Sequence, residues 1–301
     1  MLGPKQSLHA RRRRGVGYVP YAFMAPAVIT VTVMVIYPIV SVAVESLFDV
    51  RPTRHEGWDF VGFVNYVKAM QDRQVWSVLG RSMVWTVGGV FVQFVIAMIG
   101  ALLLLNIVGG RWLRAIFMLP WASPVVVGSL AWKLIYQQYG LVNQILAAVG
   151  LQDLRHAWLA DPKTALGAAM LANTWRGFPF IMILLIAGMV SVPAELYEAA
   201  AIDGANWWRE FRSITLPMIK PSIMASTLMA MIWTFNSFSN LYVLTGGGPA
   251  GSTDILTTFV YKQAFTSFDF GYASALSIVL FAIVAIGSAV YIRAYGKDAL
   301  S

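Results

Sequence analysis

The sequence predicts an all-α integral membrane protein, and three observations carry this prediction. The 301 residues are 58% hydrophobic, only 12% are charged, and the mean hydropathy is +0.66. Soluble domains have roughly 25% charged residues. Six apolar stretches are long enough to cross a bilayer, because a hydrocarbon core of about 30 Å takes about 20 helical residues. The chain therefore belongs in a membrane, with lipid as one of its partners.

The six expected transmembrane helices cover residues 21–44, 80–106, 114–137, 164–191, 221–244 and 271–294. The first could also be a secretory signal, because Arg11 to Arg14 supply a basic region and Ser41-Val42-Ala43 resembles a cleavage site. Its apolar stretch is longer than the roughly 7–15 residues of such signals, which favours an uncleaved anchor. The expected layout is a tail over 1–20, a transmembrane domain over 21–294 and a tail over 295–301.

The distribution of positive charge predicts that both termini are cytoplasmic. Twelve Lys and Arg residues fall in the expected inside segments, among them Arg11 to Arg14 and Arg114, and eight fall in the outside segments, where nine acidic residues balance them. Cations near the ends of membrane helices favour the cytoplasmic side. The Arg11 to Arg14 run could also bind nucleic acid, but beside a first span it favours anchoring at anionic lipid, so we expect no nucleic-acid partner.

Several function classes are disfavoured by residues that the sequence lacks. The chain has no cysteine, and its three histidines lie far apart outside the apolar stretches, so we expect them to be solvated loop residues. No Asp or Glu falls in an expected span, which argues against an ion-coupled carrier. A non-transport scaffold or a membrane enzyme is the alternative from another class, but no span holds a nucleophile-base pair or a metal cluster. We expect no catalytic residue and no metal ligand.

A glycine-rich segment, Gly246 to Pro249, does not predict nucleotide binding. It lacks the Lys-Ser/Thr pair that a phosphate-binding loop needs, and it falls outside the membrane in the expected topology. We therefore expect a turn in an external loop, with any ATP bound by a separate polypeptide.

Residues 194–217 interrupt the apolar pattern on the expected cytoplasmic side, between the fourth and fifth spans. The segment begins with strong helix formers, and Glu195 and Glu198 lie in the first turns, where the helix dipole favours anions. Asp203-Gly204 then predicts a helix stop followed by a turn, because glycine adopts the left-handed conformation at little cost. The sequence predicts a short helix that ends here.

A second helix is expected after the turn, capped by Asn206 and ending at Leu216-Pro217. Three aromatic side chains give it an apolar surface beside arginines, which suggests a docking surface for another protein. An amphipathic helix lying in the lipid interface is the alternative. The three aromatic residues are Trp207, Trp208 and Phe211.

The same stretch resembles the EAA loop of the membrane subunits of binding-protein-dependent ABC importers. That pattern is Glu-Ala-Ala, three residues, Gly, nine residues and Ile-x-Leu-Pro. The loop is the coupling element that fits a cleft in the ATPase subunit, so the resemblance implies a coupling role here. The implied coupling residues are Glu198, Ala199, Ala200, Asp203, Gly204, Trp207, Trp208, Phe211, Leu216 and Pro217.

The resemblance covers almost the whole chain and narrows to the carbohydrate-uptake branch, the maltose and trehalose type. The segments that carry it, beside the EAA loop, are "FVGFVNYV" (60–67), "LPWASPVVVGSLAWK" (119–133), "YGLVNQIL" (139–146), "NTWRGFPF" (173–180), "YVLTGGGPAGSTDIL" (242–256) and "FDFGYASALS" (268–277). They look like the first of the two permease subunits. The extra spans and the large external domain of the maltose example are absent here.

The resemblance implies a permease in a bacterial or archaeal cytoplasmic membrane that imports a mono-, di- or oligosaccharide by alternating access. The implied partners are a second homologous permease, two copies of an ABC ATPase, an external solute-binding protein and the sugar. ATP and Mg would be bound by the ATPase, and no cofactor is expected in this chain.

Two sets of residues on the fourth and fifth spans are candidates for the solute path. Sugar recognition needs hydrogen-bonding groups and aromatic faces in a water-filled cavity. On the fourth span, Asn173, Arg176, Gly177 and Phe180 share one helical face, and on the fifth span Trp233, Asn236, Ser237 and Asn240 have the same spacing. Helix packing is the alternative for such small and polar residues. Alignment with the maltose system adds Thr234 and Ala230.

Arg176 departs from the maltose system, which has an aliphatic residue there. An arginine within a span costs at least about 2.5–3.5 kcal/mol on insertion scales unless it faces a cavity or a partner. It could bind sugar hydroxyls, or it could favour an anionic solute such as glycerol 3-phosphate, its diesters or a sugar acid. Lys133, in the third span, is expected to reach outward or to pair with the second permease.

Overall fold

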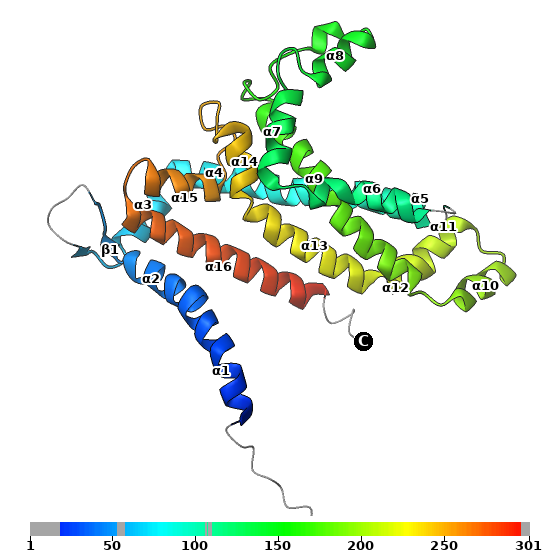
Figure 1. The fold of residues 1–301 in the computed structure, drawn as a ribbon, viewed down its shortest axis with the longest axis horizontal. Helices are drawn as coiled ribbons and strands as arrows, with labels where there is room; N and C mark the ends of the chain where they lie inside the picture. The colour runs from blue at the N-terminus through cyan, green and yellow to red at the C-terminus, as the bar shows by residue number, and fades with distance from the viewer. Residues whose placement is uncertain (1–18, 53–57, 106, 108–109, 296–301) are drawn as a thin grey trace, which may run out of the picture.

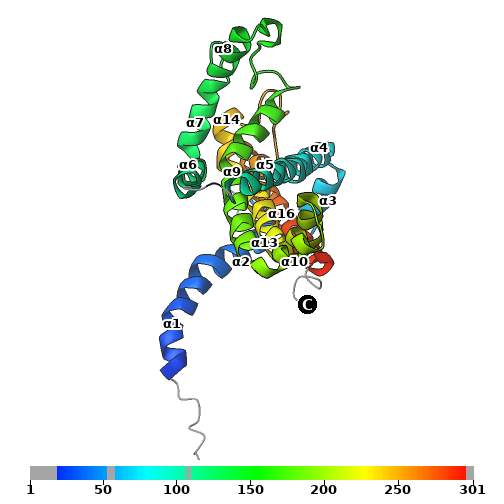
Figure 2. The ribbon, with the colours of Figure 1, turned by 90° about the vertical axis from the view of Figure 1, so that its right-hand side faces the viewer.

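The computed structural model describes residues 19–52, 58–105, 107 and 110–295. Both expected tails lie almost wholly outside these residues, and so do the Arg11 to Arg14 run, His9, His55 and Lys297. The described chain is a bundle of long helices from which two helical segments project (Figures 1 and 2).

The N-terminal arm is one long helix made of α1 (Val19–Val31), a π-helical turn (Thr32–Ile36) and α2 (Tyr37–Glu45). Its apolar stretch, Tyr21–Glu45, confirms the extent of the first expected span, and none of its most apolar window is buried within the chain. Only α2 packs on the bundle, against α16 (Phe270–Tyr295), while α1 points away from it (Figure 1).

The second expected span is longer than the sequence suggested. A two-residue hairpin, β1 (Phe48–Asp49) with β2 (Asp59–Phe60), and α3 (Val64–Gln71) lead into a rod of α4 (Arg73–Met83), a π-helical turn η2 (Val84–Gly88) and α5 (Gly89–Leu105). The helix begins at Arg73 rather than at 80 because the Asp72 carboxylate accepts a hydrogen bond from the Gln74 backbone N–H and caps the first turn.

The third expected span is broken in its middle. α6 (Gly110–Ala122) and α7 (Val125–Ile135) meet at an angle of 92°. Pro124 causes the break, since it lacks a backbone donor and disfavours helical conformation at the residue before it, Ser123. The Ser123 hydroxyl donates to the Pro120 carbonyl, 2.7 Å away, and terminates α6.

α7 leads into a lobe that projects from the bundle, formed by α8 (Leu141–Ala148) and a 3₁₀ turn (Gln152–Leu154) (Figure 1). Asn143 holds the lobe together: its amide donates to three backbone carbonyls, including that of His156, and accepts from the Trp158 indole N–H at 2.9 Å. The His156 ring packs against Trp158, so the expectation of a solvated histidine is wrong at this position.

The fourth span is α9 (Ala165–Val190), close to the expected 164–191. It is followed by α10 (Ala194–Ile202) and by a second helix made of α11 (Trp207–Glu210), a π-helical turn (Phe211–Thr215) and α12 (Leu216–Met218). Both short helices of residues 194–217 therefore form, with the turn between them at Gly204, as the sequence predicted.

The fifth expected span ends early. α13 (Lys220–Phe235) stops at Asn236, and a separate helix, α14 (Phe238–Thr245), follows. The Asn236 amide donates back to the Ile232 carbonyl at 2.9 Å, which competes with continued helix. The prediction that Trp233, Asn236, Ser237 and Asn240 share one helical face is therefore wrong.

The chain closes with α15 (Leu256–Phe265) and α16, which confirms the sixth span. Between α14 and α15, Gly246 and Gly247 have positive φ angles in a tight turn, as expected of the glycine-rich segment. Asp254 accepts from Lys262 Nζ at 2.8 Å, and Asp269 accepts from Lys68 at 3.0 Å. These ion pairs join residues that were all expected on the outside.

The bundle has two ends formed by different elements. β1, α3 and α15 lie at one end, and α10 and α11 at the other (Figure 1). Within the part of the chain that the structure describes, four helices are long and apolar enough to cross a membrane, or six if the α6–α7 pair and the α11–α13 pair, bent by 66°, each count as one span. The main apolar core lies where α5 packs on α9 and α13.

Candidate functional site

A polar cavity of about 60 Å³ lies among α5, α6, α9 and α13, at the point where α13 ends. Seven of the nine predicted solute-path residues line it: Asn173, Arg176, Gly177, Phe180, Trp233, Thr234 and Ser237. Ala230 lines it too. The structure thus brings together residues from two helices that sequence reasoning had joined only through spacing and alignment.

One wall of the cavity is aromatic. Trp121 from α6 stacks on Phe180 from α9, with ring centroids 5.9 Å apart and an interplanar angle of 20°. Phe180 in turn lies 4.6 Å from Trp233 of α13. Three rings from three helices therefore form a continuous apolar surface beside polar groups, which is the combination that a sugar ring needs.

The cavity-lining residue Asn173 belongs to a buried amide network. Asn240 donates to the Asn173 side-chain oxygen at 2.9 Å and accepts from the Ser129 hydroxyl at 2.8 Å. Asn240 is 3% exposed and does not line the cavity. The structure therefore places Asn240 behind the cavity, where it orients Asn173.

Asn236 is the second predicted residue that the structure places elsewhere. It is exposed, lies outside the cavity lining and bonds to its own helix. Because the helix ends at Phe235, the periodicity that put Asn236 beside Trp233 does not continue through it.

Arg176 lines the cavity without a partner among the described residues. Its Nε is buried and makes no hydrogen bond, and no carboxylate of the described chain lies within ion-pair distance. A buried charge is costly unless it is paired or hydrated, because hydrocarbon and protein solvate it poorly. An incoming hydrogen-bond acceptor would lower that cost.

Two lining residues were missed by sequence reasoning: Gln93 from α5 and Trp121 from α6. The signal for Gln93 was available, since it is the one polar side chain in the stretch from Gly89 to Leu105. Trp121 lies inside a segment already singled out by its resemblance, but nothing in its spacing linked it to Phe180.

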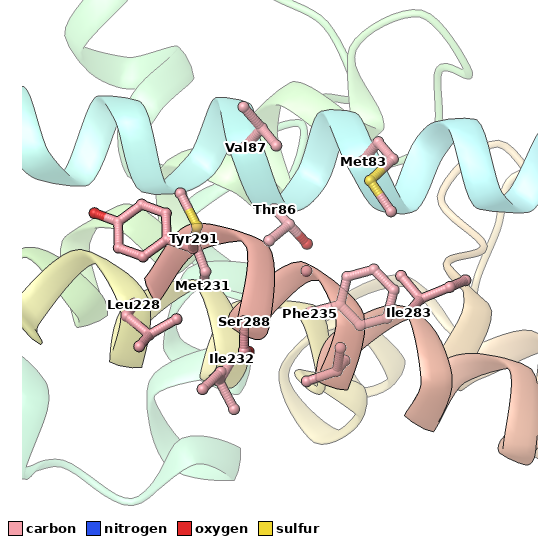
Figure 3. A pocket seen from close by; sticks show the side chains of 12 residues that line it. Met83, Thr86, Val87, Leu228, Met231, Ile232, Phe235, Ile283, Ser288 and Tyr291 are labelled. Carbon is pink, nitrogen blue, oxygen red and sulfur yellow. The ribbon is translucent and has the colours of Figure 1, made fainter. Parts of the chain in front are cut away.

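Two apolar cavities are unsuited to a polar solute. One of about 190 Å³ lies between η2, α13 and α16 (Figure 3). The side chains that line it are mostly apolar, and its hydroxyl groups belong to Thr86, Ser288 and Tyr291. Another, of about 640 Å³, lies between α7, α8 and α9 and is lined mainly by aromatic and aliphatic groups. Neither offers an ordered set of donors for sugar hydroxyls.

The expected coupling residues lie on α10, on α11 with the helical turns that follow it, and on the turn between α10 and α11, at the end of the bundle that holds α10 and α11 (Figure 1). Gly204 has φ +71, and Asn206 caps α11 by accepting from the Arg209 backbone N–H at 2.9 Å. Trp207 and Trp208 are 61% and 57% exposed. Most of the other predicted coupling residues are also exposed: Glu198, Ala199, Asp203, Gly204, Leu216 and Pro217, with Ala200 and Phe211 half-buried.

This surface is mechanically connected to the core. The Tyr197 hydroxyl of α10 shares a hydrogen bond with the Thr215 hydroxyl of the second helix at 2.9 Å. Phe211 stacks under Trp207 at 5.7 Å and also packs, with Tyr197, against the core between α5 and α9. Phe211 and Tyr197 therefore link the exposed tryptophans to the packed core of α5 and α9.

Residues 93–295 match the family described as the binding-protein-dependent transport system inner membrane component. The chain belongs to this family. It is therefore a permease subunit, a multi-pass membrane component of an ABC transporter and not an enzyme.

Curated relatives and solved structures agree with this assignment. The chain is 34% identical to the trehalose/maltose transport system permease protein MalF of Thermococcus litoralis over 276 residues, 91% of this chain and 92% of the relative. It is 30% identical to the diacetylchitobiose uptake system permease protein DasB of Streptomyces coelicolor, over 91% of this chain and 85% of the relative.

A crystal structure of a bacterial alginate ABC transporter, in complex with an alginate pentasaccharide-bound periplasmic protein, has the same fold. The TM-score is 0.80 at 19% identity, covering 94% of this chain and 95% of that chain. At this identity the likeness concerns the fold alone.

Proposed function

We propose that this chain is the first of two membrane-spanning permease subunits of an ATP-driven sugar importer. Sugar crosses the membrane through the polar cavity by alternating access. The observation that carries the proposal is the cavity itself, whose lining combines three aromatic rings with Asn173, Arg176 and Gln93. The named relatives for trehalose, maltose and diacetylchitobiose support a sugar as the solute.

The coupling surface fits a cytoplasmic ATPase. Two copies of the ATPase would bind ATP and Mg, and this chain would hold no cofactor. Closure of the ATPase dimer would act on α10 and α11, and the Tyr197–Thr215 bond and the Phe211 contact would carry the motion to α5 and α9. An interfacial helix lying on lipid explains the exposed tryptophans less well, because α10 and α11 are tied to the bundle end by these contacts.

The N-terminal arm supports a second, homologous permease. α1 leaves the bundle with its apolar side chains exposed, for example Phe23 at 82% and Ile29 at 61%. Lipid alone can cover such a helix, but a partner permease that packs against α1 would also bury these side chains. An external solute-binding protein would deliver sugar at the end of the bundle that holds β1, α3 and α15.

Purification of the assembled complex tests the sugar assignment. ATPase activity is measured with the binding protein preloaded with trehalose, maltose, diacetylchitobiose, glycerol 3-phosphate or a sugar acid. We expect a neutral sugar to give the strongest stimulation. A response to the anionic solutes alone would replace the sugar assignment with anion transport, which the unpaired Arg176 would then explain.

The expected membrane topology is tested with reporter fusions. A reporter active only outside the cytoplasm should be active after Asp153 or Asp254, because these residues are expected in external loops. It should be silent after Trp112, Asn206 or Lys297, on the expected cytoplasmic side. The inverse pattern would contradict the cytoplasmic placement of both termini.

A further inference from the structure

We propose that Gln93 of α5 is a solute-recognition residue of the polar cavity, in addition to the residues on α9 and α13. This inference rests on the proposed function and names a third helix as a source of specificity.

Burial and bonding single out Gln93. The residue is 2% exposed, yet it lines the cavity. Its amide nitrogen makes no hydrogen bond to any described residue. A buried amide without a partner is unfavourable, so such groups are rare in folded proteins unless a ligand or water satisfies them.

The backbone opposite is shaped for this side chain. A Cβ built on Gly177 of α9 would lie 2.5 Å from Gln93 Oε1 and 2.7 Å from its Cδ. A side chain at 177 would therefore displace the Gln93 carboxamide from its present place between α5 and α9. The close approach fixes the position of Gln93 without occupying its hydrogen-bonding groups.

The chemistry of a carboxamide suits a sugar hydroxyl. A carboxamide presents a donor and an acceptor side by side, and rotation exchanges the two ends. A hydroxyl is likewise both donor and acceptor. Arg176 Nε, another buried nitrogen of the cavity without a partner among the described residues, can only donate. Gln93 thus adds a hydrogen-bond acceptor for a sugar hydroxyl, which Arg176 cannot provide.

The first test replaces Gln93 by methionine, which keeps the length of the side chain and removes the amide. In the assembled importer in liposomes, uptake from subsaturating loaded binding protein should fall about fivefold to tenfold, as for loss of one buried hydrogen bond. Complex yield should stay near wild type. Gln93→Leu takes the place of Gln93→Met if the latter does not assemble.

The matched control is Thr86→Val. Thr86 lies on the same helical rod and also has a buried hydroxyl without a partner, but it lines the apolar pocket of Figure 3 instead. Its replacement should leave uptake at the wild-type rate, because no solute contact is lost.

Monodeoxy analogues of the transported sugar separate recognition from packing. The same binding protein delivers each analogue to both complexes. Its preference among the analogues therefore cancels in the ratio of wild-type uptake to Gln93→Met uptake. For the analogue that lacks the contacted hydroxyl, this ratio should fall to about one. The inference would be overturned if Gln93→Met took up the parent sugar at the wild-type rate. It would also be overturned if Gln93→Met reduced the uptake of every analogue by the same factor.

Failure of the proposed function has a different signature. The wild-type complex would then import none of the sugars. In that case, uptake by wild type and by the same variants is measured for the solute whose loaded binding protein does stimulate the wild-type ATPase. Equal uptake of this solute by wild type and Gln93→Met would again overturn the role of Gln93.

Discussion

Replacement of Gly204 by valine should abolish transport and weaken association with the ATPase. Gly204 has φ +71 at the turn between α10 and α11. A β-branched residue is strained in this left-handed conformation by roughly 1–2 kcal/mol or more, so the turn would relax and the two helices would lose their relative orientation. We expect uptake to fall at least about tenfold, measured in liposomes, together with a lower yield of copurified ATPase.

The structure refines the reason for this effect. A Cβ at position 204 meets no atom within 4 Å in this chain, so the constraint inside the permease comes from the backbone conformation and not from crowding. Gly204→Asn is the matched control, because asparagine tolerates positive φ better than other side chains. It should keep much more activity than Gly204→Val. Full transport by the valine variant would refute the assignment of this turn to ATPase coupling.

Replacement of Arg176 by leucine should reduce uptake at least about tenfold while assembly and basal ATPase activity stay near wild type. Arg176 lines the cavity and has no ion-pair partner among the described residues, so its removal breaks no contact that holds the bundle together. Uptake, complex yield and basal hydrolysis are measured on one preparation, with neutral and anionic sugars compared.

Lys133→Leu is the matched control, since it removes a cation from another helix of the membrane region that does not line the cavity. Its uptake should stay near wild type. If Arg176 instead pairs with the second permease, Arg176→Leu should impair assembly before selectivity changes. Unchanged uptake of every solute would exclude Arg176 from the path.

Composition and periodicity predicted most of the fold. The first, fourth and sixth spans match within about a residue, because each is one continuous apolar helix of a length that crosses a bilayer. The coupling helices were also predictable, because their signals, a capping asparagine and a glycine turn, act within a few residues.

The errors occur where local chemistry interrupts an apolar pattern. Pro124 bends the third span, and the Asn236 amide competes with helix continuation at the end of α13. The hydropathy of both segments hides these breaks. Extending the helical spacing past Phe235 then placed Asn236 in the path and hid the supporting role of Asn240.

Residues that reach the cavity from other helices could not be found by spacing. Gln93 and Trp121 are far in sequence from Asn173, and only the packing of α5 and α6 against α9 brings them there. A single polar residue in an apolar helix indicates a special role, but only the tertiary structure shows which residues lie beside it.

Thiol labelling of Ser237→Cys tests most directly whether the cavity is the alternating-access path. The chain has no native cysteine, so with cysteine-free partners the label reports on this position alone. A membrane-impermeant thiol reagent should react from the cytoplasmic side in the resting complex, and from the external side when ATP and loaded binding protein hold the ATPase dimer closed. Ser288→Cys, in the apolar pocket of Figure 3, should stay unlabelled. Labelling of Ser237→Cys from the same side in both states, or from neither side, would contradict the account.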